Sequence, residues 1–339
     1  MQIPGYNLDI EHAIDKIRTE KYSHIVLQLP EGLKSHVSQI VTFIEEQTTA
    51  TVYVVAQPCF GACDVFIPSC YPGPVDAIMH MGHTKMLPDD EQMVPVFYIT
   101  AQSTIDVLPV VEKTLSVFKG NTIGIVTTAQ HVHMLTQVEN LLKTNGFSPR
   151  IGKGDHRITE PGQILGCNFS AATSIADYVD CFLFLGSGTF HALGLVLATQ
   201  KPVIAADPYT HTIQKDDLET FKESILRQRY GAIAQAKQAR SYGILIGKKT
   251  GQYRFDLAHQ LRNTLKDHGK DTMMFLVDHL SPEMMQSFRH LDCLVSTLCP
   301  RLAMDDYLRY DVPIITPVEC EIALGVKKWD DYTFDEIIS

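Results

Sequence analysis

The chain repeats one succession of strand-like segments three times. Each copy opens on a short β-branched segment, continues with one that begins Val-Asp or Leu-Asp, and ends on one that starts beside a proline. The middle segments begin at Val75, Val179 and Leu291, which are 104 and 112 residues apart. Chance similarity among buried strands could explain one such match. Three landmarks that agree in order and spacing instead indicate an internal repeat.

The residues around the landmarks indicate which fold is repeated. Residues 24–29 are apolar and end at Pro30, and residues 35–46 then carry apolar side chains at helical spacing. Short apolar strands that alternate with amphipathic helices are typical of a mostly parallel sheet covered by helices. The sequence therefore predicts an α/β protein of three similar domains, with mostly parallel sheets arranged with pseudo-threefold symmetry.

The predicted domain limits fall between the copies, near Gly120 and near Ala239. We expect one α/β domain over residues 1–119, a second over 120–239 and a third over 240–339. Residues 215–240 contain one glycine and no proline. We expect them to form one long helix that joins the second domain to the third.

Composition excludes several classes of protein. Acidic residues outnumber basic ones 39 to 29 and give a formal net charge of −10, which disfavours direct binding to nucleic acid. The most apolar stretch, residues 181–198, is interrupted by three glycines and a histidine, so no membrane span is expected. Residues 1–11 lack the apolar core of a signal peptide. Eight cysteines in such a chain are typical of a reducing cytoplasm, where thiols serve as ligands, catalytic groups or buried small residues.

Each expected domain has one cysteine in a loop that follows a strand and contains glycine or proline. These cysteines are Cys59, Cys167 and Cys299. Loops at the carboxyl ends of parallel strands build the sites of α/β folds, so three domains around one axis would bring the three thiols together. A [4Fe–4S] cluster has four irons to ligate. Three cysteines would leave one iron open for a substrate, as the open position of a catalytic zinc site does.

The other five cysteines have simpler explanations or compete for this role. Cys181 and Cys293 occupy the same position in repeated strands and are expected to fill the core, and Cys320 is expected to be structural. Cys63 and Cys70 are the competitors. Six residues separate them, so the CxxxCxxC motif of ordinary radical enzymes is absent. The chain has no CxxC pair, although a zinc site stays possible in principle.

Seven short motifs, in order along nearly the whole chain, resemble one enzyme family. They are PEGL at 30–33, CFGACD at 59–64, LGC at 165–167, GSGTFHALGL at 186–195, DPY at 207–209, GKKTGQ at 247–252 and CPRLAMDD at 299–306. Together they are similar to the archaeal-type diphthamide synthases. These are non-canonical radical S-adenosylmethionine enzymes that form 2-(3-amino-3-carboxypropyl)histidine.

The resemblance implies a fold, a cofactor and a reaction. It implies three α/β domains around a central [4Fe–4S] cluster, with Cys59, Cys167 and Cys299 as the ligands, and a homodimer that receives electrons from a donor. The reduced cluster would cleave the Cγ–S bond of S-adenosylmethionine and release methylthioadenosine. The 3-amino-3-carboxypropyl radical would then add to C2 of a histidine in translation elongation factor 2. One departure from plain repetition is that Cys59 and Cys167 follow the second strand of their copies, whereas Cys299 follows the third.

Several further residues are candidates for binding S-adenosylmethionine. The small residues Gly186, Ser187 and Gly188 follow a buried strand and would let backbone amides approach a carboxylate. His191 could orient the substrate, or it could make an ordinary helix-entry bond. The remaining candidates follow other strands and are Asp207, Tyr209, Gln252 and Asp278. For Asp207 and Tyr209 the alternative is a simple turn. No catalytic residue beyond the cluster ligands is predicted.

Two alternatives stay open at this point. A quinolinate synthase-like enzyme would also have three pseudo-symmetric α/β domains and three cluster cysteines. A non-enzymatic metal-binding or electron-transfer protein would use the cysteines for a structural or passive metal centre. The contexts of Cys59 and Cys299 fit the diphthamide family better than either.

Overall fold

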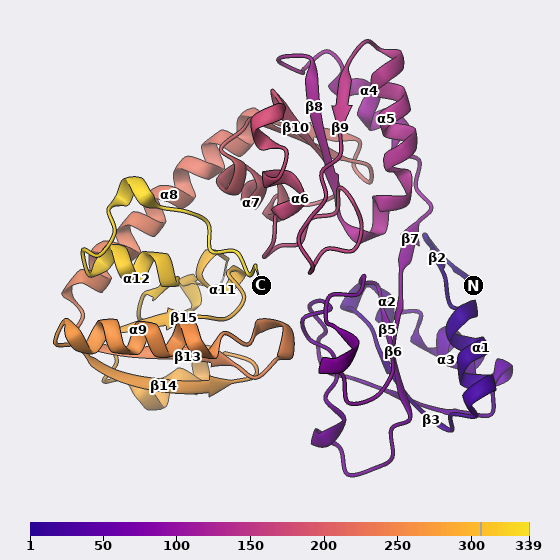
Figure 1. Ribbon diagram of the computed structural model, residues 1–339, viewed down its shortest axis with the longest axis horizontal. Helices are drawn as coiled ribbons and strands as arrows, with labels where there is room; N and C mark the ends of the chain where they lie inside the picture. The colour runs from indigo at the N-terminus through magenta and orange to yellow at the C-terminus, as the bar shows by residue number, and fades with distance from the viewer. Residues whose placement is uncertain (306, 339) are drawn as a thin grey trace.

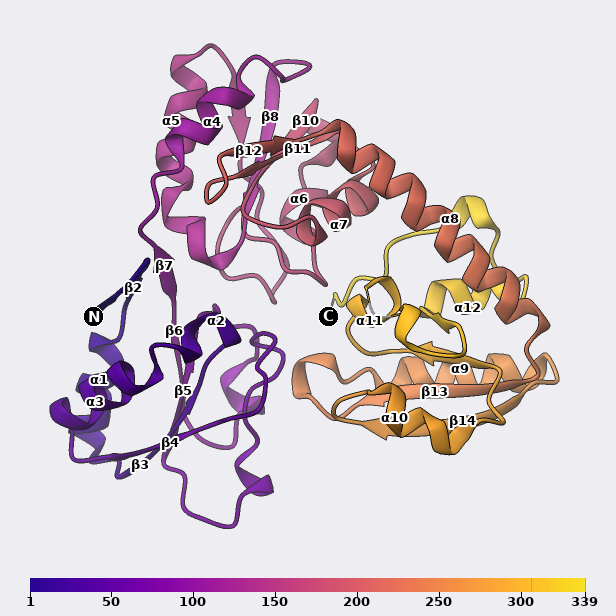
Figure 2. The same ribbon diagram turned by 180° about the vertical axis from the view of Figure 1, so that it is seen from behind.

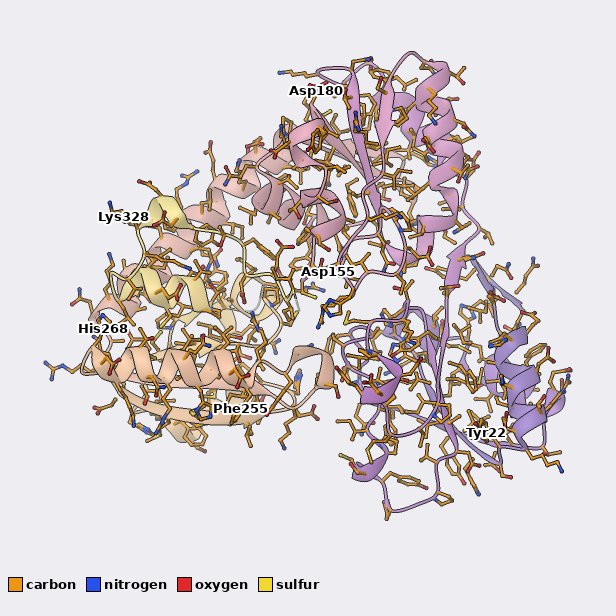
Figure 3. The ribbon with its side chains drawn as sticks, viewed as in Figure 1. Tyr22, Asp155, Asp180, Phe255, His268 and Lys328 are labelled. Carbon is orange, nitrogen blue, oxygen red and sulfur yellow. The ribbon has the colours of Figure 1, made fainter. Side chains whose placement is uncertain are left out.

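The computed structural model describes residues 1–305 and 307–338. The described chain forms three lobes at the corners of a triangle (Figures 1 and 2), each built on a sheet of its own. Figure 3 shows the side chains on all three lobes in the same view. No helix in this part of the chain is both long and apolar enough to cross a bilayer.

The first lobe contains a four-stranded parallel sheet in the order β4-β3-β5-β6. Its strands are β3 (His24–Gln28), β4 (Thr51–Val54), β5 (Ala77–Met81) and β6 (Val96–Ile99), and its helices are α1 (Glu11–Glu20), α2 (Glu31–Lys34) and α3 (Val37–Gln47). A small antiparallel sheet lies beside them and consists of β1 (Gln2–Ile3), β2 (Tyr6–Leu8) and β7 (Ala101–Ser103).

The second lobe repeats this order with one added strand. Its sheet runs β12-β11-β10-β8-β9 and is parallel except for β12. The strands are β8 (Thr122–Thr127), β9 (Ser148–Arg150), β10 (Cys181–Leu185), β11 (Val203–Asp207) and β12 (Thr212–Gln214), and the helices are α4 (Leu108–Thr114), α5 (Leu135–Thr144), α6 (Ser170–Thr173) and α7 (Phe190–Thr199). Cys181 is buried among these strands.

The third lobe has the same four-stranded parallel arrangement, β14-β13-β15-β16. Its strands are β13 (Ser241–Gly247), β14 (Asp271–Val277), β15 (Cys293–Ser296) and β16 (Ile314–Ile315), and its helices are α9 (Phe255–Asp267), α10 (Pro282–Met285), α11 (Arg301–Met304) and α12 (Pro317–Ala323). Cys293 and Cys320 are buried in its core. In each lobe the strand that comes first along the chain lies between the second and the third, so the predicted α/β class and internal repeat are confirmed.

An aspartate at the same place in each lobe explains the Val-Asp and Leu-Asp landmarks. It precedes the third strand, and its Oδ2 accepts two backbone N–H bonds of 2.7–2.9 Å where the first strand begins. The bonded pairs are Asp76 with residues 23 and 24, Asp180 with 121 and 122, and Asp292 with 240 and 241. Because the carboxylate satisfies donors at the strand start, these bonds lower the pKa of Asp180 and Asp292.

The helix α8 (Asp216–Gln238) connects the second and third lobes (Figure 1), as the sequence predicts. It packs against α7 of the second lobe and α12 of the third. Its Arg229 is fully buried and donates to both carboxylate oxygens of Glu319, at 2.7 and 2.5 Å, and to two backbone carbonyls. A buried charge is tolerated only when it is paired and hydrogen-bonded, so this contact fixes how α8 sits on the third lobe.

Two segments that lie outside residues 120–239 pack against the second lobe. Helix α4 precedes residue 120, yet Val107, Val110 and Val111 are buried against β8 and β10. At the other end of the chain, Phe334 packs edge-to-face on Phe169, with 5.5 Å between ring centroids. The C-terminal residues therefore return from the third lobe to the second.

Candidate functional site

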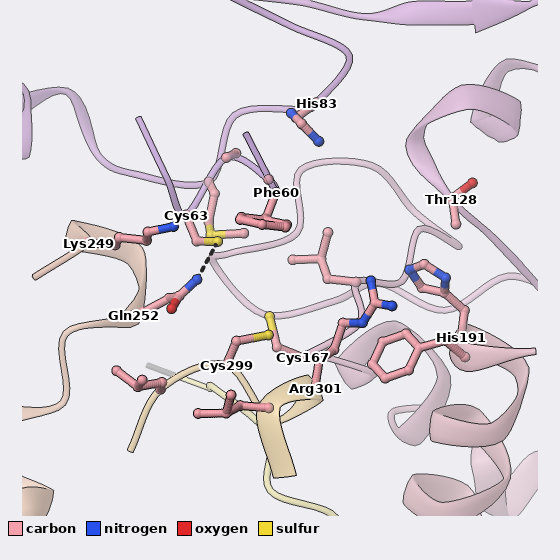
Figure 4. Close-up of a pocket in the computed structure, with 18 of the residues that line it drawn as sticks. Phe60, Cys63, His83, Thr128, Cys167, His191, Lys249, Gln252, Cys299 and Arg301 are labelled. Atoms are coloured by element: carbon pink, nitrogen blue, oxygen red, sulfur yellow. Dashed lines mark hydrogen bonds between the residues drawn. The ribbon is translucent and has the colours of Figure 1, made fainter. Parts of the chain in front are cut away.

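A cavity of about 530 Å³ lies where the three lobes meet. Each lobe supplies part of its wall, including one cysteine: Cys63 from the first, Cys167 from the second and Cys299 from the third. Cys63 lies in a loop after β4 and Cys167 in a loop after β9, whereas Cys299 lies in a loop after β15. Figure 4 shows the three side chains facing the same space.

One of the three predicted ligands does not line the cavity. Cys59 is buried but does not line the cavity, whereas Cys63 does. The Cys59 Sγ instead faces a separate cluster with His80 and His83. A hydrogen-bonded turn at residues 61–64, closed by the Asp64 N–H on the Gly61 carbonyl at 3.0 Å, directs the two thiols differently. The lining of this cavity therefore favours Cys63 over Cys59, and the predicted ligand role of Cys59 stays a prediction that the lining does not support.

Burial makes all three cavity thiols poor acids. Removal from water raises the pKa of Cys299 to about 12 and raises that of Cys167 well above its ordinary value. The neighbouring thiols add to this effect, because Cys299 and Cys63 raise the pKa of Cys167. Three thiolates could share this site only if a cation compensated their charge. Clustered thiolates select soft metals such as iron in iron–sulfur clusters, zinc or copper(I).

Residues of the third lobe hold the loop that carries Cys63. The Gly251 N–H donates to the Cys63 carbonyl at 3.2 Å, and the Gln252 Nε2 donates to the Cys63 Sγ at 3.3 Å. Lys249 forms a 2.8 Å ion pair with Asp64. A Cβ at Gly251 would lie 2.4 Å from the Cys63 Cα, so only glycine permits this approach. Gln252 is a predicted site residue, but its partner here is a cysteine.

Contacts from the second lobe complete the junction. Arg157 donates to the Gly251 carbonyl at 2.7 Å and also approaches the Met86 sulfur at 3.1 Å. The buried pair Thr84 and Gln163 joins the first and second lobes by hydrogen bonds of 2.8 and 3.1 Å. The cavity wall is therefore held by direct bonds among all three lobes.

The C-terminal residues position the other two cysteine loops. The Ile337 N–H donates to the Cys167 carbonyl at 2.7 Å. Arg254 binds Asp335 through two bonds of 2.8 Å and also donates to the carbonyls of Thr297 and Leu298, next to Cys299. These supporting residues were not predicted, because nothing in the C-terminal sequence distinguishes them from surface charges.

Three of the eight predicted S-adenosylmethionine contacts line the cavity: His191, Gln252 and Asp278. His191 is partly buried beside Phe184 and Phe190. Burial, followed by the charge of Arg301, lowers the pKa of its imidazole to about 4. His191 is therefore neutral at physiological pH. Asp278 is exposed at the rim.

The other five predicted contacts are absent from the described lining of this cavity. They are Gly186, Ser187, Gly188, Asp207 and Tyr209. The Asp207 Oδ1 accepts the N–H groups of Tyr209 and Thr210 at 2.8 and 3.2 Å, so the turn interpretation of this motif is correct. The Tyr209 hydroxyl donates to the Ser103 Oγ at 3.3 Å. Ser187 and Gly188 are exposed between β10 and α7.

Comparisons with known proteins agree with the geometry. The family model described as "Putative diphthamide synthesis protein" matches residues 29–333. The 2-(3-amino-3-carboxypropyl)histidine synthase of Pyrococcus horikoshii is 35% identical over 317 residues, which cover 93% of this chain and 89% of that protein. Subunit 1 of the corresponding synthase of Mus musculus is 28% identical, over 96% of this chain and 73% of that protein.

The fold comparison gives the same result. The crystal structure of Dph2 from Pyrococcus horikoshii with a 4Fe-4S cluster superposes with a TM-score of 0.89. It is 32% identical, and the match covers 98% of this chain and 94% of that one. The convergent cysteines, the threefold α/β architecture and these similarities together show that the chain belongs to the diphthamide synthesis protein family.

Proposed function

We propose that this chain is a transferase that catalyses the first step of diphthamide biosynthesis. It would move the 3-amino-3-carboxypropyl group of S-adenosylmethionine to C2 of a histidine in translation elongation factor 2 and release methylthioadenosine. The observation that carries this proposal is the convergence of Cys63, Cys167 and Cys299 on one cavity. The names of the relatives favour this reaction over that of a quinolinate synthase-like enzyme or an electron carrier.

The donor set fits a [4Fe–4S] cluster held by Cys63, Cys167 and Cys299. Three thiolates leave one iron without a protein ligand, which is where a substrate could bind. When bound, such a cluster would supply the electron that cleaves the Cγ–S bond of S-adenosylmethionine. Gln252 supports this assignment, because its amide donates to a ligand sulfur, and hydrogen bonds of this kind tune such centres.

The protein's own residues would orient the substrate. Bond selection requires the methionine portion, rather than the ribose carbon, to lie nearest the cysteines, so positioning is the main catalytic contribution of the chain. The cationic side chains of Lys249 and Arg301 line opposite parts of the wall and could attract the substrate carboxylate. Neutral His191 could accept or donate a hydrogen bond there. Binding by residues 186–188, Asp207 and Tyr209 stays a prediction that the lining does not support.

The remaining expectations belong to the same proposal. The three sheets support domains with limits near 1–119, 120–239 and 240–339, with α4 and residues 334–337 lying on the second. The reaction requires elongation factor 2 and an electron donor as partners. We further propose that the chain forms a homodimer and works in the cytoplasm, without binding nucleic acid or a membrane directly.

Iron and product analysis test the proposal. After anaerobic reconstitution, Cys63→Ala, Cys167→Ala and Cys299→Ala should each lose most of the iron and sulfide, whereas the buried Cys181→Ala control should retain both. With dithionite and S-adenosylmethionine, the unmodified chain should release methylthioadenosine. An EPR signal that changes on addition of S-adenosylmethionine is also expected. Dominant release of 5′-deoxyadenosine, or full iron content in Cys63→Ala, would overturn the assignment.

A further inference from the structure

A second cluster of metal-binding side chains lies in the first lobe, beside the cavity. Cys59 and His80 are buried and His83 is partly buried, and one potential ligand atom of each lies within 4.8 Å of the others. We propose that Cys59, His80 and His83 form a zinc site that is distinct from the three cavity cysteines. This inference does not depend on the cluster assignment, because the two sites share no residue.

The distances suit a tetrahedral ion. The His80 Nε2 lies 3.0 Å from the His83 Nδ1. Zn–N bonds of about 2.0–2.1 Å in a tetrahedral site place two nitrogens roughly 3.3 Å apart. A shift of a few tenths of an ångström would therefore convert the histidine pair into a chelate.

The neighbourhood of His80 fixes its ring in the form that binds metal. The Gln28 Nε2 donates to the Asp64 carbonyl at 2.6 Å, and the Gln28 Oε1 accepts the Phe66 N–H at 2.9 Å. These two bonds determine the orientation of the Gln28 amide. The His80 Nδ1 lies 3.0 Å from the Gln28 Oε1. Because this oxygen can only accept a hydrogen bond, the His80 Nδ1 must carry a proton. The lone pair of His80 is then on Nε2, which points into the cluster. An acceptor that holds the other ring nitrogen is characteristic of zinc-bound histidine.

The donor set determines the class of metal. One thiolate and two imidazoles suit Zn²⁺, and three protein ligands leave a fourth position open. Binding would displace the thiol proton of Cys59 to solvent, shift the His83 proton from Nδ1 to Nε2, and leave the site with one net positive charge. Because His83 lines the cavity and Cys59 shares a loop with Cys63, the ion would lie at the cavity wall and restrain that loop.

Zinc analysis of the reconstituted protein tests this site. The iron-loaded chain is equilibrated with zinc sulfate and dialysed, on a Cys70→Ser background that removes the exposed thiol. About one zinc per chain should remain. Its X-ray absorption K-edge should show one sulfur near 2.3 Å and two nitrogens near 2.0–2.1 Å. No retained zinc, or a shell of three sulfurs, would overturn the proposal.

Variants separate the two sites. Cys59→Ala and His80→Gln should lose zinc and keep iron, Cys63→Ala should lose iron and keep zinc, and the control His24→Gln, in the same lobe, should keep both. If substitution of the buried Cys59 or His80 impairs folding, His83→Asn, at a partly exposed position, provides the same test and should also lose zinc and keep iron. If Cys59→Ala and His80→Gln retained as much zinc as the unmodified chain, the zinc would be an adventitious ion only. Loss of iron from Cys59→Ala with retention in Cys63→Ala would overturn both assignments.

The support given by Gln28 has a measurable consequence. Removing a hydrogen-bond partner of a zinc-bound histidine typically weakens metal binding 10–100-fold. Gln28→Leu should therefore lower zinc affinity by about that factor in competition with a chromophoric chelator. Unchanged zinc affinity would show that His80 is not a ligand.

Discussion

The side-chain amide of Gln252 donates a 3.3 Å hydrogen bond to the Cys63 sulfur, across 189 residues of chain and between two lobes. The bond opposes the effect of burial and lowers the pKa of Cys63, which burial raises. The third lobe therefore tunes the thiol that the first lobe contributes. Sequence spacing could not show this relationship, because it depends on how the lobes meet.

The first prediction concerns the electronic effect of this bond. Gln252→Leu should make the reduction potential of a reconstituted cluster more negative, because the bond stabilises the more negatively charged state. If the bond contributes about 1 kcal/mol more in the reduced state, the shift is roughly 40 mV. An EPR-monitored redox titration measures it. The control is Gln130→Leu, at another glutamine that lines the cavity. Equal potentials in both variants would contradict the prediction.

The second prediction concerns the close approach at Gly251. In Gly251→Ala the new Cβ would meet the Cys63 Cα at 2.4 Å and its Cβ at 2.6 Å. The loop must move, at a cost of about 1–3 kcal/mol, and the iron content should fall. Gly231→Ala is the matched control, because its Cβ meets nothing within 4 Å on the exposed side of α8. That change should stabilise the chain by about 0.5–1 kcal/mol. Urea unfolding and iron analysis distinguish the two outcomes.

The repeat in the sequence is sufficient to predict the three-lobed architecture. It does not predict the contacts that hold distant segments together. The three sets of strand landmarks correspond to three sheets with the same strand order. The strands can be recognised in the sequence because strand formation depends on the local pattern of apolar residues. The aspartates of the landmarks are visible in the sequence, yet their bonds to the first strand are not. The position of Phe334 on the second lobe depends on packing between segments far apart in the chain.

The cavity could be predicted only in part, for a similar reason. The sequence predicts one ligand cysteine per lobe, and one cysteine of each lobe lines the cavity. It does not show which of Cys59 and Cys63 faces inward, because three residues lie between them and the direction of each side chain depends on the turn that these residues form. Likewise, glycines at 186 and 188 indicate an accessible backbone but not the surface that it faces.

The third prediction concerns acid stability. Burial lowers the pKa of His191 to about 4, below its ordinary value of 6.5, so the unfolded chain binds the extra proton first. The contribution of His191 to stability is then complete above pH 6.5 and is lost as the pH falls toward 4. Urea midpoints measured from pH 7.5 to 4.5 should fall less steeply for His191→Gln than for the unmodified chain. The exposed His156→Gln should follow the unmodified chain, and parallel curves for all three would refute the prediction.

The fourth prediction concerns the buried ion pair on α8. Arg229→Met or Glu319→Met should each destabilise the chain by about 3–5 kcal/mol, because each leaves the other charge buried without its partner. The double variant should recover much of that loss. Arg227→Ala, at an exposed pair with Glu223 on the same helix, should change stability by less than about 0.5 kcal/mol. Denaturant unfolding of the four variants measures the coupling, and additive losses in the double variant would rule it out.

The bonds from residues 335–337 to the cysteine loops have a consequence for biosynthesis. A ribosome makes the first lobe, the second and the third in that order, and domains generally begin to fold as they emerge. The Cys167 carbonyl receives its Ile337 partner, and Arg254 its Asp335, only after all three cysteines have been translated. The contacts that hold the Cys167 and Cys299 loops can therefore form only after the segment that follows all three cysteines has been synthesised.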